Sequence, residues 1–185
     1  MAFAQVQRGR SFLSGGIGFN TSSPKNPAPG ETKQFTHFDI NAKYGFMIGN
    51  SWAIGISPSY STQMQKYAAG GTRVGTDFGI GPFVRKYFAL SDKFYFHLDA
   101  SYSFDQIGSY STDVNGNKIK DPKSTSNVIA ISPGASYFIT DRVALQAMLG
   151  SLAYTKYNGP ATNASTGFVV NFGISSITLG AALYF

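Results

Sequence analysis

Apolar and polar side chains alternate along much of this chain with a period of two residues. The alternation is cleanest in residues 38–48 and 94–104, where the even positions are apolar or aromatic and the odd ones are mostly polar or small. A period of two places the two sets of side chains on opposite faces of a β-strand. The pattern therefore predicts strands with one apolar and one polar face.

Eight such segments can be counted between turn signals. They are residues 10–20, 34–48, 52–64, 74–88, 93–105, 127–139, 143–157 and 166–185. Short turns at 49–51, 91–92 and 141–142 alternate with longer polar loops at 21–33, 65–73, 106–125 and 158–165. Short connections at one end and long ones at the other are typical of transmembrane barrels, and an even strand number places both termini at the same end.

The residues available for the polar face decide between a membrane barrel and a soluble one. Only 13% of residues are charged, and the polar positions are mostly Gly, Ser, Asn and Tyr. Small polar groups suit the narrow interior of an eight-stranded barrel, whereas a soluble lipocalin-like barrel places its charges outside. Aromatic residues also stand near strand ends on the apolar face: Trp52, Tyr60, Phe88, Phe94, Tyr102, Phe104, Tyr137 and Phe185. The predicted fold is an all-β, eight-stranded antiparallel up-and-down transmembrane β-barrel.

Composition limits the other classes of protein. The chain has 185 residues, with 16 Phe, 11 Tyr and 21 Gly, which favours strands over helices. It contains no run of 18 apolar residues and no cysteine, so we expect no transmembrane helix, disulfide or thiolate metal site. The net charge of +6 is spread singly along the chain, which argues against a nucleic-acid partner.

The N-terminal segment is predicted to lie outside the barrel. Its Ala2-Phe3-Ala4 triplet has the small-x-small form that precedes a secretory cleavage site, although the charged and apolar regions of a full signal peptide are missing. We therefore expect residues 1–9 to form an N-terminal segment that includes the end of a signal peptide. Residues 10–185 form the barrel domain.

The last predicted strand is about twice as long as a membrane crossing needs, and its alternation changes phase. Even positions are apolar up to Ile174, whereas odd positions are apolar from Ile177 to Phe185. A one-residue bulge near Ser175 and Ser176 would reconcile the two halves.

The final eight residues, TLGAALYF, resemble the C-terminal assembly signal of bacterial outer-membrane barrels. Thr178, Gly180, Leu183 and Phe185 fill its polar, glycine, hydrophobic and terminal aromatic places. The stretches GPFVRKYFALSDKFYFHLDASYSF and ISPGASYFITDRVALQAMLGSLAY also resemble the small outer-membrane β-barrel family of Bacteroidota. This resemblance implies an outer-membrane location with periplasmic termini. It also implies insertion by the outer-membrane assembly machinery, and contact with outer-membrane lipid and lipopolysaccharide.

The inward polar positions are the candidates for chemistry. They are Asp39, Asn41, Lys43, Asp77, Arg85, Tyr87, Tyr95, His97 and Asp99. In a narrow barrel, charges of both signs are expected to pair, so we predict a packed polar core that conducts ions poorly. His97, Asp99 and Ser101 form a row with the residue types of a hydrolase, but the row points inward. We expect no catalytic residues, no metal site and no cofactor.

The loops are the predicted place of any recognition. Within the 106–125 loop, Asn115-Gly116 is a hairpin turn signal, and Lys118, Lys120 and Lys123 are candidates for binding anionic lipopolysaccharide or a protein. The predicted role is structural or surface-binding, without catalysis. The alternatives are an accessory barrel of a larger complex, which a lipid-facing seam of small residues at Gly15, Ala147 and Ala153 would support, and a narrow channel or a lipid-modifying enzyme.

Overall fold

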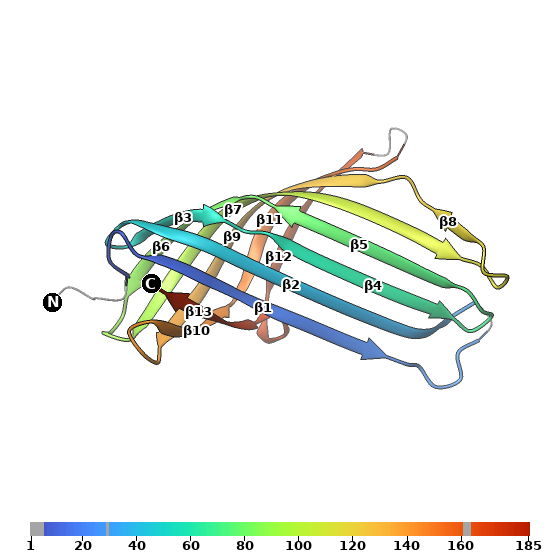
Figure 1. Ribbon diagram of the computed structural model, residues 1–185, viewed down its shortest axis with the longest axis horizontal. Coiled ribbons are helices and arrows are strands. Elements are labelled where there is room, and N and C mark those ends of the chain that lie inside the picture. The colour runs from blue at the N-terminus through green and yellow to red at the C-terminus, as the bar shows by residue number, and fades with distance from the viewer. Residues whose placement is uncertain (1–5, 29, 161–163) are drawn as a thin grey trace.

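The computed structural model describes residues 6–28, 30–160 and 164–185, which form one antiparallel sheet (Figure 1). Residues 1–4, where the sequence predicts the end of a signal peptide, lie outside this part. The strands are β1 (Ser11–Ser22), β2 (Thr32–Gly49), β3 (Trp52–Ile56), β4 (Ser59–Tyr67), β5 (Thr72–Ile80), β6 (Pro82–Ala89), β7 (Phe94–Thr112), β8 (Lys118–Lys120), β9 (Ser124–Phe138), β10 (Val143–Met148), β11 (Gly150–Asn158), β12 (Ala164–Phe172) and β13 (Thr178–Tyr184).

The sheet closes into a barrel of eight spanning strands, which confirms the predicted fold class. Neighbours in sequence are neighbours in the wall, and four spanning strands are divided in two: β3 with β4, β5 with β6, β10 with β11 and β12 with β13. The wall closes where β1 pairs with β13, from Phe12 with Tyr184 to Gly15 with Ala181. The start of β1 and the end of β13 lie at the same end of the barrel (Figure 1).

Proline and glycine explain three of the four interruptions. Pro58 separates β3 from β4, and Gly81 with Pro82 separates β5 from β6. Proline has no N–H to donate to a ladder, so a gap opens beside it. Between β10 and β11, Gly150 adopts a φ of 121°, which other residues rarely tolerate.

At Gly150 the alternation of inward and outward side chains changes phase, so the side chains that face outward change as well. Ala147 pairs with the exposed Leu179, whereas Ala153 pairs with Ala130 and faces the interior. The small-residue seam expected at Gly15, Ala147 and Ala153 is therefore wrong for Ala153. The phase of the strand changes between the two alanines, and a single run of alternation does not reveal that change.

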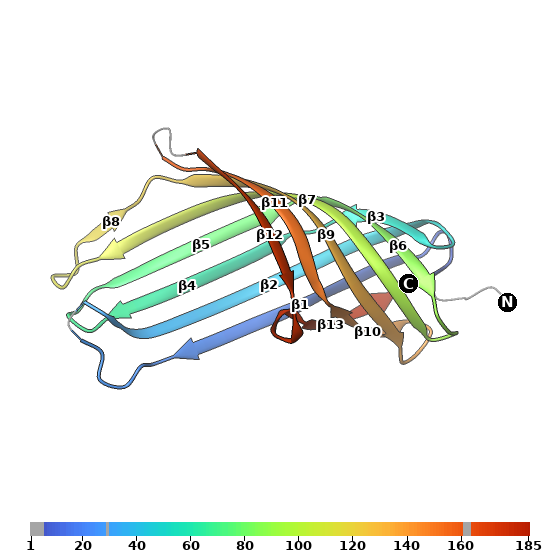
Figure 2. The same ribbon diagram turned by 180° about the vertical axis from the view of Figure 1, so that it is seen from behind.

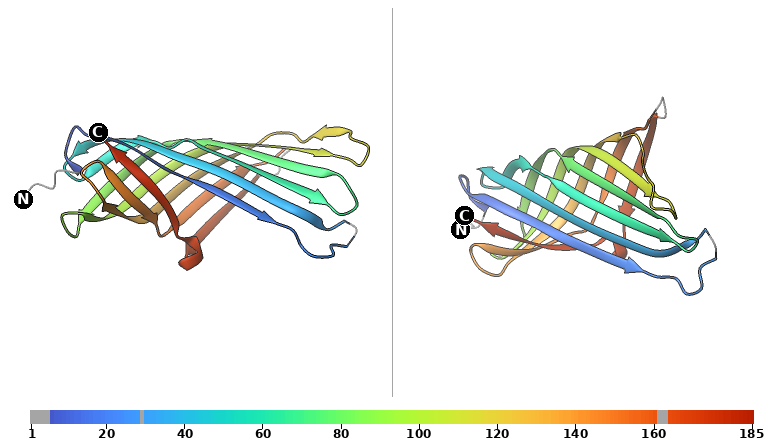
Figure 3. Two further views of the ribbon diagram at one scale, coloured as in Figure 1. Left: turned by 60° about the horizontal axis from the view of Figure 1, so that its bottom comes forward. Right: turned by 45° about the vertical axis from the view of Figure 1, so that its right-hand side comes forward.

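The eighth spanning strand is divided near the predicted place, but by more than a one-residue bulge. Gly173 and a 3-10 turn, Ile174–Ser176, separate β12 from β13 (Figure 3). The two halves also have different neighbours, since β13 pairs with β10 and β1, whereas β12 pairs with β11 alone among the described residues. The interruption therefore redirects the strand, and the loop-side part of β12 runs apart from β1 (Figure 2).

The strands continue further toward the loops than alternation predicted. β2 begins at Thr32 and β7 extends to Thr112, so much of the expected 106–125 loop is strand. The hairpin predicted at Asn115-Gly116 is confirmed, because β8 pairs with the end of β7 and Gly116 takes a φ of 86°. Toward the loops the strands carry Ser, Thr and Gln on both faces, so no apolar row marks them.

The interruptions divide the barrel into two parts, which we name by their position. The closed half contains β3, β6, β10, β13 and the segments of β1, β2, β7 and β9 paired with them. The loop half contains β4, β5, β8, β11, β12 and the rest of the long strands. The start of β1 and the end of β13 belong to the closed half, and the β7–β8 hairpin lies at the tip of the loop half (Figure 1).

Candidate functional site: the barrel interior

Aromatic side chains fill the interior of the closed half. Phe12, Tyr95, Phe138 and Tyr184 are each at most 1% exposed. The Phe138 ring centroid lies 4.8 Å from that of Tyr184 and 5.4 Å from that of Tyr95, and Phe12 stacks on Tyr184 at 5.3 Å. Val6, from the N-terminal segment, is also buried in this cluster. These rings pack against one another and fill much of the interior of the closed half.

A charged cluster lies beside the aromatic rings. The Arg85 guanidinium donates two hydrogen bonds to the Asp99 carboxylate, Nε to Oδ1 at 2.6 Å and Nη2 to Oδ2 at 2.9 Å. Lys43 Nζ donates to Oδ2 of the same carboxylate at 2.5 Å. Arg85 and Asp99 are almost fully buried, and this bidentate geometry is the kind that offsets part of the cost of burying charge.

Tyrosines join the charged cluster to the aromatic one. Arg85 Nη1 donates to the Tyr87 hydroxyl at 3.2 Å, and the Tyr87 and Tyr184 hydroxyls are 2.9 Å apart. The guanidinium also lies 5.3 Å from the Phe12 ring centroid and 5.9 Å from that of Phe83, within cation–π range. A single network therefore links β1, β2, β6, β7 and β13.

His97 and Asp99 do not form a catalytic pair. His97 Nδ1 lies 3.2 Å from Ser136 Oγ, which in turn accepts from Gln146 Nε2, while the Asp99 oxygens bind Arg85 and Lys43. His97 is fully buried, and its Nε2 has no partner among the described residues. The arrangement lacks an accessible nucleophile next to a base.

The remaining predicted interior residues lie further from the chain ends, in the loop half or next to it. Asn41 and Asp39 line a cavity between β1 and β13, and Asp39 also lines a second cavity with Asp77 and Asp105. His37 Nε2 lies 3.3 Å from Asp39 Oδ1. Asp77 is therefore remote from the Arg85–Asp99 pair, although the sequence pattern places all three residues on the polar face.

Sequence reasoning missed several interior partners. Ser136, Gln146 and Tyr184 are buried beside the predicted residues, and Arg73 pairs with Asp121 at 3.3 Å in the loop half. The strand phase could have identified the first three, because they occupy the inward positions of β9, β10 and β13. The pair Arg73–Asp121 joins a strand to a segment predicted as loop, and alternation gave no signal for it.

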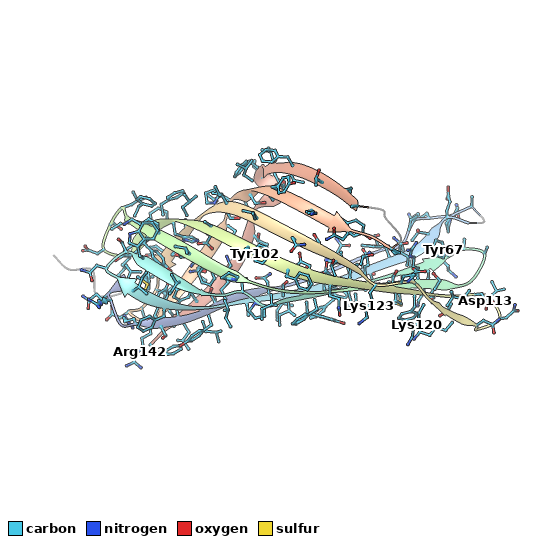
Figure 4. All side chains as sticks on the ribbon, turned by 90° about the horizontal axis from the view of Figure 1, so that it is seen from above. Tyr67, Tyr102, Asp113, Lys120, Lys123 and Arg142 are labelled. Carbon is cyan, nitrogen blue, oxygen red and sulfur yellow. The ribbon has the colours of Figure 1, made fainter. Side chains whose placement is uncertain are left out.

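Lys120 and Lys123 lie toward the opposite end of the molecule from Arg142 (Figure 4), and Lys118 lies in β8 with Lys120. Lys118 Nζ lies 3.6 Å from the Tyr110 ring centroid, and Lys123 Nζ donates to Gln106 Oε1 at 3.2 Å. Lys120 pairs through its backbone with Tyr110 and is exposed. The three ammonium groups thus have different surroundings and do not form one cluster.

The residues of the C-terminal signal lie in β13 and just after it. Leu183 and Phe185 are exposed on the outside of the barrel, while Gly180 lies so close to the backbone of Gly15 that a Cβ would collide with it. Thr178 and Gly180 line the cavity between β1 and β13. These positions complete the barrel closure.

Two further features concern the part of the chain that the structure describes. None of its helices has the length and hydropathy of a membrane-crossing helix. In the same residues, no group of three His, Asp or Glu side chains is placed to hold a metal ion.

Comparison with solved structures identifies similar barrels. The crystal structure of Neisserial surface protein A (NspA) aligns over 95% of this chain and 97% of that chain, with a TM-score of 0.53 and 17% identity. The attachment invasion locus protein Ail of Yersinia pestis, crystallised with the heparin analogue sucrose octasulfate, covers 97% and 100%, with a TM-score of 0.49 and 14% identity. The likeness to NspA establishes the fold, that of small outer-membrane barrels.

No family model matches this chain, and no curated protein matches it. The resemblance to the Bacteroidota family therefore stays a prediction.

Proposed function

We propose that the protein is a small integral outer-membrane barrel with periplasmic termini and a structural or surface-binding role without catalysis. The observation that supports this most is the outer surface of the barrel. Its exposed side chains are apolar over a continuous band that includes Leu13, Ile17, Ile40, Tyr44, Ile54, Ile56, Val84, Leu98, Ile129, Ile131 and Leu145. A monomer in water rarely exposes an apolar surface of this extent.

The thickness of the band fits a membrane. Phe94 and Tyr137 pair near the termini, and Phe104 pairs with Ile80 further along, so exposed aromatic residues border the band on both sides. The ten residue steps from Phe94 to Phe104 cover about 33 Å along β7. With a tilt of about 40° this becomes about 25 Å, the height of the apolar band of outer-membrane barrels.

The packed closed half supports a role other than conduction. Its buried aromatic rings and the Arg85–Asp99 pair occupy the lumen, whereas channels of larger barrels are wide and water-filled. In planar bilayers the protein should give no discrete conductance steps. Regular single-channel openings from monodisperse, heat-modifiable protein would contradict this part of the proposal.

The loop half supports a role in recognition outside the membrane. Beyond the apolar band its strands carry Ser, Thr, Gln and Lys, and the β7–β8 hairpin presents Lys118 and Lys120 at its tip. We assign contact with lipid and lipopolysaccharide to this end, with Lys123 near the membrane surface. Other outer-membrane proteins are further candidate partners, and the chain offers no basic stripe for nucleic acid.

Orientation can be tested by cysteine labelling, since the chain has no cysteine of its own. Asn115→Cys places a thiol in the β7–β8 hairpin, and Asp92→Cys places one in the β6–β7 turn at the other end. In intact cells a membrane-impermeant maleimide should label the first, and should label the second only after the outer membrane is permeabilised. Labelling of Asp92→Cys alone in intact cells would reverse the proposed orientation.

The role of the C-terminal signal is also testable. If Thr178, Gly180, Leu183 and Phe185 are read by the assembly machinery through strand pairing, deletion of Phe185 should lower the amount of assembled barrel in cells. Refolding of the same variant into detergent should remain nearly intact, because Phe185 is 58% exposed. Equal losses in both settings would mean that Phe185 acts through packing.

A further inference from the structure

The wall of the barrel is open between β1 and β12. Within the described residues, β1 pairs with β13 from Phe12 to Gly15, and further along residues 16–22 pair with β2 on one side alone. β12 pairs with β11 along its whole length and has no second neighbour within the described residues. Two strand edges therefore face each other across an opening that begins beside Thr178, the first residue of β13 (Figure 2).

The opening lies within the apolar band. Ile17 and Phe19 on β1 are 73% and 69% exposed, and Phe168 and Val170 on β12 are 66% and 63% exposed. Unpaired backbone groups are costly in hydrocarbon and are tolerated at membrane depth only where they are buried in protein or line a water-filled cavity. Val169 points inward between Phe168 and Val170 and is still 50% exposed, so the interior is accessible beside this edge.

A cavity of about 160 Å³ lies at the base of the opening, and its lining includes residues of both faces of the wall. Its lining combines lipid-facing apolar residues, Ile17 and Leu179, with interior polar residues, Asn41 and Lys43. Gly16 forms part of its edge and leaves the passage free of a side chain. An apolar entrance joined to a polar interior fits a molecule with a hydrocarbon tail and a polar head.

Lys43 gives the interior side of the cavity a preference for an anionic head group. Its ammonium has three donors, of which Asp99 uses one, and its side chain is 22% exposed. Arg85 lies in the same lining, while Asp99, the carboxylate between the two cations, is already paired with both. Asp39 lines the cavity on the loop side, close to His37. A carboxylate head bound at Lys43 would lie on the side of the cavity away from Asp39, since these residues are four apart on β2.

We propose that the opening is a lateral portal that admits a single-chain amphiphile with a carboxylate head. The tail lies between Ile17 and Leu179 in the membrane, and the head reaches Lys43 in the cavity. The inference rests on insertion of the barrel into a membrane. Heat-modifiable gel mobility reports that insertion separately from ligand binding.

The test uses photo-crosslinking in phosphatidylcholine nanodiscs with palmitic acid that carries a diazirine beside its carboxylate. Mass spectrometry should map the label to peptides of the cavity, from β1, β2 and β13. Gly16→Leu should reduce this label at least about tenfold by filling the cavity, because a Cβ at Gly16 has room and further atoms project into the passage. Gly167→Leu is the matched control, since its surroundings are open and it does not line the cavity.

A second variant separates the head from the tail. Lys43→Gln should reduce labelling by the palmitic acid probe about tenfold or more, and should leave labelling by the corresponding hexadecanol probe unchanged. Label confined to lipid-facing residues, or equal in Gly16→Leu and the wild type, would overturn the proposal. Crosslinked dimers joined through β12, with an unlabelled cavity, would also overturn the proposal. They would mean that a strand from a second copy of the chain covers the opening.

Discussion

The two halves of the barrel contain the same number of spanning strands but differ in how their interiors and walls are completed. In the closed half the wall is continuous, and the interior holds aromatic rings around a fully hydrogen-bonded Arg85–Asp99 pair. In the loop half the interior is polar and accessible, and the wall is open between β1 and β12. The comparison indicates that the closed half holds the buried contacts that stabilise the barrel, whereas the interior of the loop half is lined by more accessible polar side chains.

The largest expected difference concerns the buried charges. Asp99→Ala leaves Arg85 and Lys43 without their shared carboxylate and should lower the free energy of unfolding by about 3–5 kcal/mol. In the loop half, Asp121→Ala removes the exposed partner of Arg73 and should cost less than about 1 kcal/mol. Urea unfolding in lipid vesicles measures both. Equal losses would remove the contrast in stability between the halves.

A smaller effect is expected for two matched tyrosines. Tyr184→Phe removes the hydroxyl that pairs with Tyr87 in the closed half and should cost about 1 kcal/mol, because no water replaces it there. Tyr157→Phe removes a hydroxyl that donates to Ser124 at 2.8 Å in the loop half. Its cost in the same unfolding experiment should be smaller, since water can take its place. A larger cost for Tyr157→Phe than for Tyr184→Phe would show that the interior of the closed half is hydrated.

The sequence predicted the eight strands and most of the faces of their side chains, but not the height along the barrel at which each residue lies. Lipid outside and a polar interior enforce alternation over the band, so Asp39, Arg85 and Asp99 could all be assigned inward. Which of them meet depends on register, and Asp99 meets Arg85 and Lys43 while Asp39 does not. The open wall also escaped prediction, because pairing between β1 and the last strand is a long-range property.

The extension of the strands beyond the band has a related cause. Where water contacts both faces, neither face needs to be apolar, and the segment of β7 from Gln106 to Thr112 reads as loop. Local turn chemistry remained visible there, since Asn115-Gly116 correctly predicted the hairpin. Short-range signals thus identified the turn, whereas the strands next to it can be recognised only from the strands with which they pair.

The smallest expected effect is a pH dependence confined to the loop half. Hydrogen bonds from the Asn117 side chain and from the Asn117 and Asn115 backbone N–H groups hold the pKa of Asp113 below its ordinary value of 3.8. A lowered pKa means that the carboxylate supports the hairpin turn above pH 3.8, and that this support is lost as pH falls through the lower value.

NMR signals of the Asn115 and Asn117 amides should therefore shift as the pH falls below 3.8, while amides of β13 stay constant. Asp113→Ala should abolish the shift. A shift of equal size in the variant would assign the titration to another group.

Amide hydrogen exchange in nanodiscs tests the contrast between the halves most directly. Amides of β13 from Ala181 to Tyr184, which lie between β1 and β10, should be strongly protected. On β12, every second amide from Phe168 to Phe172 faces the opening and should exchange about as fast as loop amides, while the alternate ones bonded to β11 are protected. Uniform protection along β12 equal to that of β13 would mean that the wall is closed throughout, and would contradict both the contrast and the portal.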